Sequence, residues 1–511
     1  MYPRVWRPVQ IRMRKNTFVP IVVFAVLIAL FGIGFFAVIK KKPKPILCAD
    51  CNVILLSVDS LRADHIGTFG YKRDTTPNFD AFSREGALFL NYFSTSFLTP
   101  VSEMSVHTGL YPTSHGVTNF ETVLPKNRTT IAEYLKTKNY ETSAISSSPE
   151  FEINPALKKS FSRGFDRYRY FIDASGKHRQ FFPGEMSSEL DTLADKKFFL
   201  WLAVGGVHWP YGDGFQNIYA DKDYNGFFKN RSLDWTTFQN IYKGMEYISG
   251  RGLPIYNHDV QYVIDNYDNG VRAFDDFLGQ LIDELKRRNL LEKTIVVIES
   301  EHGEGLHEHG YFAHYDVLDN QVHVPLLIFS PSFESGKRIS SLSSSVDVFP
   351  TIIELLGGTA PDPVQGKSLA PIIGGKEKDG IRQEVFIERN PLWEEAAPEV
   401  MFPLKILGIN VVSEGYKDIA IRTPEWKYIL RLSKKRVEEI SWWQALTGQL
   451  VNIPEDELYN LIDDPMETQN VADRYPEERR MLRKKLEDWY TEISRNAPEN
   501  VEIEQKIQPY F

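Results

Sequence analysis

Residues 294–310, TIVVIESEHGEGLHEHG, place a short β-branched run directly before a cluster of acids and histidines. The run from Ile295 to Ile298 predicts an interior strand of a parallel sheet, which is buried on both faces. In open α/β sheets, ligands bind just beyond the carboxyl ends of such strands. Glu301 and His302 follow at that position. A solvated acidic loop on the surface is the alternative interpretation.

The same pattern of a buried strand followed by a potential ligand occurs twice more. Residues 52–58 (NVILLSV) predict a strand that ends at Asp59, and residues 197–204 (KFFLWLAV) predict another that leads to His208. A helix N-cap or a turn is the alternative role for Asp59. Carboxylate oxygens with imidazole nitrogens suit Mn²⁺ or Zn²⁺, whereas sites built mainly from oxygen suit Ca²⁺ or Mg²⁺.

Composition excludes some classes of protein. The chain has 511 residues, of which 42% are hydrophobic and 25% are charged, as in ordinary globular proteins. This length allows two or three domains, or one large α/β domain with an appendage. The net charge of −9 argues against a nucleic-acid partner, because a nucleic-acid-binding protein presents a basic face.

Residues 17–39 carry no charge and are numerous enough to cross a hydrocarbon core of about 30 Å. Four lysines follow, rather than the small-residue cleavage site of a secretory signal. We therefore predict a single-pass transmembrane helix at 17–39, after a short basic tail (1–16) and before a linker (40–51). The segment before the helix contains one more basic residue than the segment after it. This difference favours a cytoplasmic N-terminus and an extracytoplasmic catalytic domain.

Cys48 and Cys51 are the only cysteines. Two thiols cannot complete a four-ligand zinc site. We favour a local disulfide formed in an oxidising compartment, with two idle thiols as the alternative.

The remaining pattern predicts an α/β catalytic domain over residues 52–380 and a smaller α+β subdomain over residues 381–511. Helices are expected within 75–93 and at 129–138, 257–289, 346–356 and 476–495, and further strands at 140–146, 324–329, 384–388, 418–421 and 426–430. Residues 150–190 show no periodicity and predict an irregular excursion. Residues 212–256 form a long insertion, a candidate lid.

A fourth potential site element is Thr99, which lies in a segment rich in hydroxyls and turn formers. A divalent ion lowers the pKa of a coordinated hydroxyl, so that a threonine alkoxide becomes accessible. Nearby imidazoles can protonate a leaving oxygen or stabilise developing charge. Together these residues favour metal-assisted displacement at phosphorus or sulfur.

Several stretches, in this order and at these spacings, resemble the sulfatase family of the alkaline phosphatase superfamily over residues 52–495. They are residues 52–71, 99–117, 207–211, 294–310, 323–331, 346–357, 422–430 and 457–472. The resemblance implies an alkaline-phosphatase-like fold, in which a mostly parallel sheet is flanked by helices and followed by a smaller antiparallel sheet with one helix.

The resemblance also implies roles for individual residues. Asp59, Thr99, Glu301 and His302 match the ligands of one divalent ion, which could be Ca, Mg, Mn or Zn. His208 matches the active-site histidine. His314 stands where many members have a lysine that contacts the substrate anion, so that this contact would depend on pH near neutrality. Glu301 replaces the usual aspartate, and Ser60 replaces a second acid that often follows the first.

Thr99 falls on the nucleophile position, where sulfatases have a cysteine or serine that is oxidised to formylglycine. Oxidation of threonine gives a ketone, so no formylglycine is expected, and Glu103 replaces the arginine of the same pattern. Threonine here resembles the phospho-transferring branches of the superfamily, which include membrane-anchored enzymes that move phosphoglycerol or phosphoethanolamine head groups. Ser102 is a minor alternative nucleophile.

We therefore predict a membrane-anchored, metal-dependent hydrolase or phosphotransferase that acts on an anionic ester substrate through Thr99, with phosphate mono- or diesters favoured. One alternative is a sulfuric ester hydrolase with an unconventional nucleophile. The other is a catalytically degenerate binding protein at the membrane, which the departures at Ser60, Glu103, Glu301 and His314 would explain.

Overall fold

The computed structural model describes residues 46–171, 181–212, 215–234, 236–238, 255–333, 336–375, 377, 380–390, 417–432 and 456–498. The basic tail, the predicted membrane span at 17–39 and the first part of the linker lie outside these residues, as does part of the 212–256 insertion. Within the described ranges, no helix is both long enough and apolar enough to cross a membrane.

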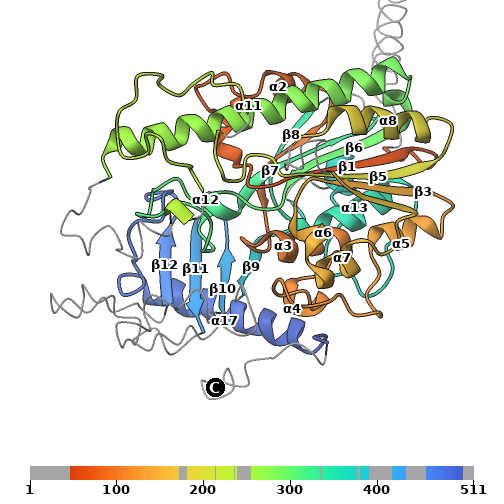
Figure 1. Cartoon of the computed structure of the whole chain (residues 1–511). Helices are drawn as coiled ribbons and strands as arrows, with labels where there is room; N and C mark the ends of the chain where they lie inside the picture. Colours follow the sequence, from red (N-terminus) through yellow and green to blue (C-terminus); the bar gives the residue numbers. More distant parts are fainter. Residues whose placement is uncertain are drawn as a thin grey trace, which may run out of the picture. The chain divides into compact units, whose positions relative to one another are not determined.

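A sheet of eight strands in the order β4-β3-β5-β1-β6-β7-β2-β8 forms the centre of the described chain (Figure 1). Its strands are β1 (Asn52–Val58), β2 (Ala87–Phe93), β3 (Glu141–Ser146), β4 (Arg167–Tyr170), β5 (Phe198–Val204), β6 (Thr294–Ser300), β7 (His323–Phe329) and β8 (Lys337–Ser344). β7 runs antiparallel to both of its neighbours, and all remaining pairs are parallel. The predicted mostly parallel sheet is confirmed.

Helices cover both faces of this sheet. Residues of α2 (Pro77–Phe82), α8 (Pro183–Leu193) and α11 (Asn257–Arg287) pack on one face, and residues of α3 (Thr99–Thr108), α5 (Ile131–Lys136), α6 (Glu150–Ile153), α7 (Pro155–Phe161) and α13 (Val348–Leu355) pack on the other. Ile54 and Leu56 of β1 contact the first group and Val53 and Leu55 the second, because side chains along a strand alternate between faces. Burial on both faces explains the continuous apolar runs of the central strands.

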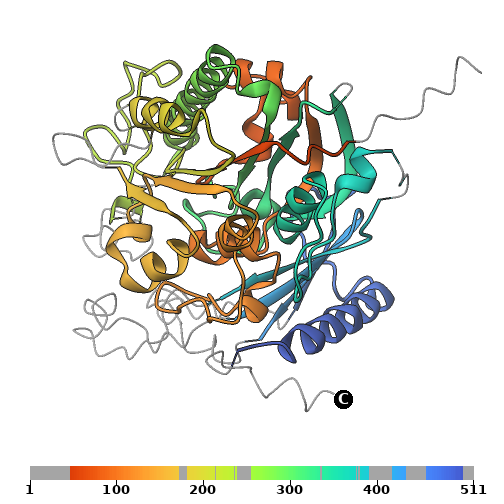
Figure 2. The ribbon, with the colours of Figure 1, turned by 90° about the vertical axis from the view of Figure 1, so that its right-hand side faces the viewer.

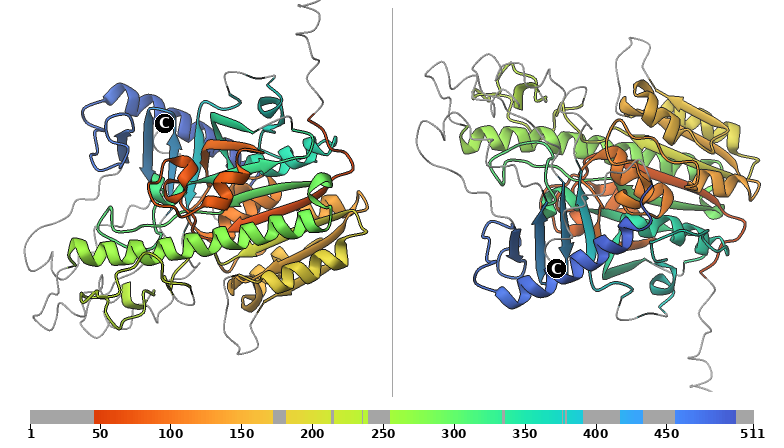
Figure 3. Two further views of the ribbon diagram at one scale, coloured as in Figure 1. Left: turned by 90° about the horizontal axis from the view of Figure 1, so that it is seen from above. Right: turned by 90° about the horizontal axis from the view of Figure 1, so that it is seen from below.

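The longest helix, α11, lies along one face of the sheet (Figure 3). It has 31 residues and is therefore about 46 Å long. Val263, Tyr267, Val271, Phe274 and Leu278 are buried at helical spacing. The helix predicted at 257–289 is confirmed to within two residues.

A second, antiparallel sheet has the order β12-β11-β10-β9. Its strands are β9 (Val385–Arg389), β10 (Asp418–Arg422), β11 (Trp426–Arg431) and β12 (Asp456–Asn460), and α17 (Pro476–Ser494) packs on it through Leu482, Leu486 and Trp489 (Figure 2). The expected C-terminal antiparallel sheet with one helix is thus confirmed. The domain boundary at 380/381 stays a prediction. Three short helices complete the described α-helices: α4 (Pro112–His115), α12 (Asp319–Val322) and α14 (Ala370–Ile373).

Two sequence predictions differ from the structure. Within 75–93, only Pro77–Phe82 is helical, whereas Ala87–Phe93 forms β2 and pairs with β7 and β8. Residues 150–190 include α6, α7, β4 and α8 and are not an irregular excursion. These elements are short or carry exposed polar residues, so they lack the apolar periodicity on which the prediction relied.

Cys48 and Cys51 form a disulfide immediately before β1, as favoured from the sequence. The backbone N–H of Cys48 donates to the carbonyl of Leu355 at 2.7 Å, which joins this segment to the end of α13. The chain therefore enters the central sheet through a covalently closed turn.

Candidate metal-dependent active site

Three neighbouring parallel strands deliver side chains to one edge of the sheet. In β1, Val58 is the register partner of Val204 in β5 and of Ser300 in β6. The residues that follow these strands therefore lie side by side, as expected for the carboxyl ends of parallel strands. Asp59 follows β1, and its backbone N–H donates to the carbonyl of Val204 at 3.1 Å.

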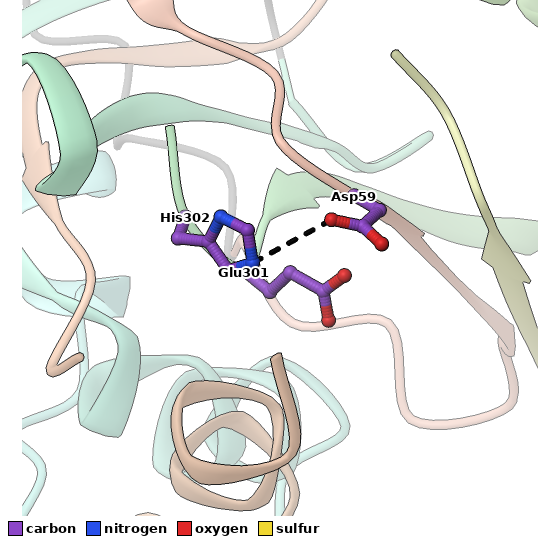
Figure 4. Close-up of side chains that lie close together, drawn as sticks. All are labelled: Asp59, Glu301 and His302. Atoms are coloured by element: carbon purple, nitrogen blue, oxygen red, sulfur yellow. Dashed lines mark ion pairs between the residues drawn. The ribbon is translucent and has the colours of Figure 1, made fainter. Parts of the chain in front are cut away.

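Asp59, Glu301 and His302 form one compact cluster, in which a ligand atom of each lies within 4.8 Å of the others. Figure 4 shows the two carboxylates and the imidazole directed toward a common point. The Nε2 atom of His302 is 3.5 Å from Oδ1 of Asp59. All three residues are buried, with exposed fractions of 5%, 3% and 0%. The structure thus brings together three of the four residues expected from the sequence to bind the ion, and their role as ligands stays a prediction.

The charges of this cluster have no arginine or lysine partner among the described residues. Burial raises the pKa of Asp59 to about 8. Burial, and then the charge of Asp59, raise the pKa of Glu301 well above its ordinary value. Two buried carboxylates at this distance require either protons or a cation. With an imidazole beside them, they fit a divalent ion, which neutralises both.

The imidazole of His302 is held in the tautomer that a metal ligand needs. Its Nδ1–H donates to the carbonyl of Gly303 at 2.9 Å, which leaves the lone pair of Nε2 facing the cluster. Burial lowers the pKa of His302 well below its ordinary value, so the ring is neutral at pH 7. The side chain of Ser60 contacts Asp59, because its hydroxyl donates to Oδ1 of Asp59 at 2.9 Å.

Thr99 begins α3, and its hydroxyl donates to Nε2 of His302 at 3.0 Å. The predicted nucleophile therefore lies in contact with the cluster of Asp59, Glu301 and His302. Its position at the start of a helix is favourable for an anionic oxygen, because the partial positive charge of the helix dipole lies there. Ser102, the alternative nucleophile, is fully buried, and its hydroxyl donates to the carbonyl of Leu98 within the helix.

His208 and His314 lie beside the cluster. The ring centre of His314 is 4.2 Å from that of His302 and 5.2 Å from that of His208. Nδ1–H of His208 donates to the carbonyl of Trp209 at 2.8 Å. Burial, and then the charge of His208, lower the pKa of His314 well below its ordinary value. His314 is thus neutral at pH 7 and does not titrate near neutrality, contrary to the sequence-based expectation.

Glu304 contacts His314, an interaction that the sequence did not indicate. It is fully buried, and its Oε1 accepts a hydrogen bond from Nδ1 of His314 at 3.1 Å. Burial raises the pKa of Glu304 to about 7. Glu304 and His314 lie in an irregular loop. The spacing of residues in a strand or helix therefore could not predict that they are in contact.

Replacing Glu304 with glutamine is expected to lower kcat for esters with a poor leaving group by about ten- to hundred-fold. The carboxylate stabilises the positive charge that the neutral imidazole of His314 gains when it carries a proton to the leaving oxygen, and an amide cannot. Steady-state rates with phenyl and 4-nitrophenyl esters would measure this, and the phenyl ester should suffer more. Glu308→Gln is the matched control, because Glu308 lies in the same loop but pairs with Arg62. Equal losses for both esters would contradict this role.

Glu103, which occupies the arginine position of the formylglycine pattern, points into the protein core. Its Oε1 accepts hydrogen bonds from Ser57 at 2.9 Å and from His107 at 3.0 Å, and burial raises its pKa to about 8. Glu299, the register partner of Ser57, is also fully buried. His107 and His115 form hydrogen bonds inside the core.

A profile of the Sulfatase family matches residues 51–358, which is more than half of the chain. The chain belongs to the sulfatase family. This membership, together with the observed fold, places it in the alkaline phosphatase superfamily, as the resemblance implied. The family match covers Asp59, Thr99, His208, Glu301, His302 and His314.

Similar proteins carry sulfatase names. Human arylsulfatase K is 31% identical over 212 residues, which cover 42% of this chain and 34% of that protein. The match therefore spans about a third of the length of this relative. Arylsulfatase K of Xenopus laevis is 22% identical over 442 residues, 80% of this chain and 77% of that protein. The ulvan-active sulfatase of Formosa agariphila is 23% identical over 491 residues, 87% of this chain and 76% of that protein.

Solved structures with the same fold include both sulfatases and a phosphonate hydrolase. The phosphonate monoester hydrolase of Agrobacterium radiobacter superposes with a TM-score of 0.64 at 18% identity, over 87% of this chain and 96% of that chain. A 2-O GAG sulfatase superposes with a TM-score of 0.64 at 19% identity, over 87% and 92%. These similarities establish the fold.

Proposed function

We propose that this sulfatase-family chain is a metal-dependent hydrolase or transferase of phosphate mono- or diesters that works through a covalent intermediate on Thr99. One observation carries the proposal: the Thr99 hydroxyl lies 3.0 Å from Nε2 of His302, which itself belongs to the Asp59–Glu301–His302 cluster. A nucleophile and a set of metal ligands in contact are what displacement at phosphorus requires.

In this proposal Asp59, Glu301 and His302, with Thr99 as the fourth ligand, would hold one divalent ion. When bound, such an ion lowers the pKa of a neighbouring hydroxyl and neutralises negative charge. Thr99 Oγ1 attacks phosphorus, the bond to the leaving oxygen breaks, and a phosphothreonine forms. The proton released by Thr99 passes through His208 or His314 to the leaving oxygen. Water, or an acceptor alcohol in a transferase, then releases the phosphoryl group from Thr99.

The identity of Thr99 supports phosphorus over sulfur as the reacting atom. A threonine cannot give the formylglycine aldehyde, and the arginine of that pattern is replaced by the core residue Glu103. A phosphonate monoester hydrolase among the proteins of the same fold is consistent with this preference. The similarity to arylsulfatase K supports sulfuric ester hydrolysis as the second candidate.

We also propose that residues 17–39 anchor the chain in a membrane, with the catalytic part on the extracytoplasmic side. The uncharged 23-residue segment supports the anchor. The disulfide between Cys48 and Cys51 supports the side, because disulfides persist in oxidising compartments.

The choice of substrate can be tested with three chromogenic esters: 4-nitrophenyl phosphate, bis(4-nitrophenyl) phosphate and 4-nitrophenyl sulfate. We expect kcat/KM for at least one phosphate ester to exceed that for the sulfate by about 100-fold or more. A chelator should abolish all turnover. Sulfate turnover that persists in Thr99→Ala would overturn the proposal. A chain that binds no metal after reconstitution and cleaves none of the esters would instead indicate the degenerate binding protein.

A further inference from the structure

The chain between β6 and β7, which carries His314, packs on the antiparallel sheet. Val317 in this connection shares one apolar cluster with Ile429 of β11. Tyr428 and Leu430, the neighbours of Ile429 along the strand, belong instead to the cluster that includes α17, because side chains along a strand alternate between faces. One face of β11 therefore meets α17 and the other meets the connection that carries His314. α12, at the end of that connection, lies beside β11 (Figure 1).

Two cations of β11 lie on the face that meets this connection. Lys427 and Arg431 stand two residues before and two residues after Ile429 and are therefore on the same face. Their side chains are 0% and 5% exposed. Nζ of Lys427 is 2.7 Å from Oδ1 of Asp319, the first residue of α12. The guanidinium of Arg431 binds both oxygens of Asp316, from Nη1 at 2.9 Å and from Nη2 at 3.4 Å. Buried cations of the antiparallel sheet thus hold the connection at two points.

Arg431 is itself fixed by the strands on either side of β11. Its Nε and Nη2 bind the two carboxylate oxygens of Glu457 in β12 at 3.1 and 2.9 Å, and its Nη1 binds Oδ2 of Asp418 in β10 at 2.8 Å. Burial alone would raise the pKa of Asp316, but the charge of Arg431, and then that of Arg389, hold this pKa well below its ordinary value. Asp316 is therefore ionised at pH 7, and its contact with Arg431 is a charge-assisted pair with two hydrogen bonds.

This pair lies two residues along the chain from His314, which belongs to neither a strand nor a helix. The imidazole of His314 is held on one side by Oε1 of Glu304, at 3.1 Å. The backbone that follows is held by Gln321, whose Oε1 accepts from the N–H groups of Tyr315 at 2.6 Å and of Asp316 at 2.7 Å. The position of the imidazole therefore depends on these side-chain contacts and not on a regular element.

On the basis of the proposed function, we infer that Arg431 is a positioning residue for His314. By binding Asp316 from the antiparallel sheet, it holds the imidazole at the place beside the cluster from which it carries a proton to the leaving oxygen. An arginine suits this role because its planar fork can bind several carboxylate oxygens in fixed directions, whereas a lysine is a point charge. The C-terminal part of the chain thus contributes to the reaction through the connection that it holds.

The test removes the charge of Asp316, because Arg431 then keeps its two other carboxylate partners. Metal-loaded Asp316→Asn is compared with wild type on phenyl and 4-nitrophenyl phosphates, as monoesters or as methyl diesters, whichever the wild-type protein cleaves. We expect kcat to fall about ten-fold for the phenyl ester and about two-fold for the 4-nitrophenyl ester, because a good leaving group needs less help from a proton. The ratio of the two kcat values should therefore change about five-fold.

Asp456→Asn is the matched control. Asp456 is a buried aspartate of the same sheet and binds Arg479 of α17 through both of its oxygens, at 2.7 and 2.8 Å. This variant should keep the wild-type ratio of the two esters, and Arg431→Lys should give a ratio between those of wild type and Asp316→Asn. In a His314→Ala background, Asp316→Asn should not change the ratio further, because the imidazole through which it acts is absent.

The outcomes separate this inference from the proposed function. If wild-type protein cleaves both esters and Asp316→Asn lowers both rates equally, the pair supports only the fold, so the inference is wrong and the proposed function stands. If metal-loaded wild-type protein cleaves neither ester, the proposed function fails, and amide hydrogen exchange then tests the positioning alone. Exchange at Tyr315 that is about ten-fold faster in Asp316→Asn but unchanged in Asp456→Asn would support it. Equal exchange in the two variants would overturn it.

Discussion

Replacing Thr99 with alanine is expected to lower kcat for phosphate-ester cleavage by about 10⁴-fold or more, because the variant lacks the atom that forms the covalent intermediate. The remaining cluster can still bind the ion and the ester, so KM should change far less than kcat. Steady-state kinetics with the ester that wild-type protein cleaves fastest measures both constants. Mass spectrometry of acid-quenched wild-type protein should find a phosphate group on the peptide that contains Thr99.

Ser102→Ala is the matched control for this experiment. Ser102 is the next hydroxyl in α3, but its side chain is fully buried and bonded to the carbonyl of Leu98. We expect this variant to keep kcat within about three-fold of wild type. A result in which Ser102→Ala is inactive, or in which the phosphate is found on Ser102, would show that the nucleophile is misassigned.

Removal of the divalent ion is expected to abolish turnover and to make the unfolding free energy fall as the pH rises from about 5 to 8. Burial raises the pKa of Asp59 and of Glu103 to about 8 and that of Glu304 to about 7. The folded state then keeps protons that the unfolded state releases above about pH 4.5. Each retained proton stabilises the folded state at low pH. As the pH rises from the unfolded pKa to the folded pKa of a group, the unfolding free energy falls by about 1.4 kcal/mol per pH unit for that group.

Urea unfolding of the metal-free and the metal-loaded protein at pH 5.5, 6.5 and 7.5 would measure this effect. The metal-loaded protein should show a weaker dependence, because a bound cation keeps the cluster carboxylates ionised. Glu103→Gln removes one buried acid outside the cluster, so it should reduce the slope of the metal-free protein without preventing metal binding. A metal-free protein whose stability is independent of pH would contradict the argument.

The sequence predicts best the parts whose burial is uniform. β1, β5 and β6 are apolar over most of their length, and α11 repeats its apolar residues at helical spacing, so each of these elements was predicted close to its bounds. β8 was missed because its sequence KRISSLSS is that of a polar edge strand. β2 was assigned to a helix because its strand identity depends on pairing with β7 and β8, which are distant in the sequence.

The same reasoning explains which site residues could be predicted. Asp59, Glu301 and His302 each follow a buried run, and a parallel sheet brings the ends of such runs together. The bond between Glu304 and His314 depends on how a loop folds back on itself, and no local pattern encodes that geometry.

The direction of β1 determines at which side of the sheet the protein can be tethered. Cys51 adjoins the amino end of this strand and Asp59 its carboxyl end, so seven residues, or about 23 Å, separate the disulfide turn from the first metal ligand. Ile46, at which the described chain begins, therefore lies near the edge of the sheet remote from Asp59. A tether attached at the amino end of β1 is therefore attached away from the edge of the sheet at which Asp59 lies.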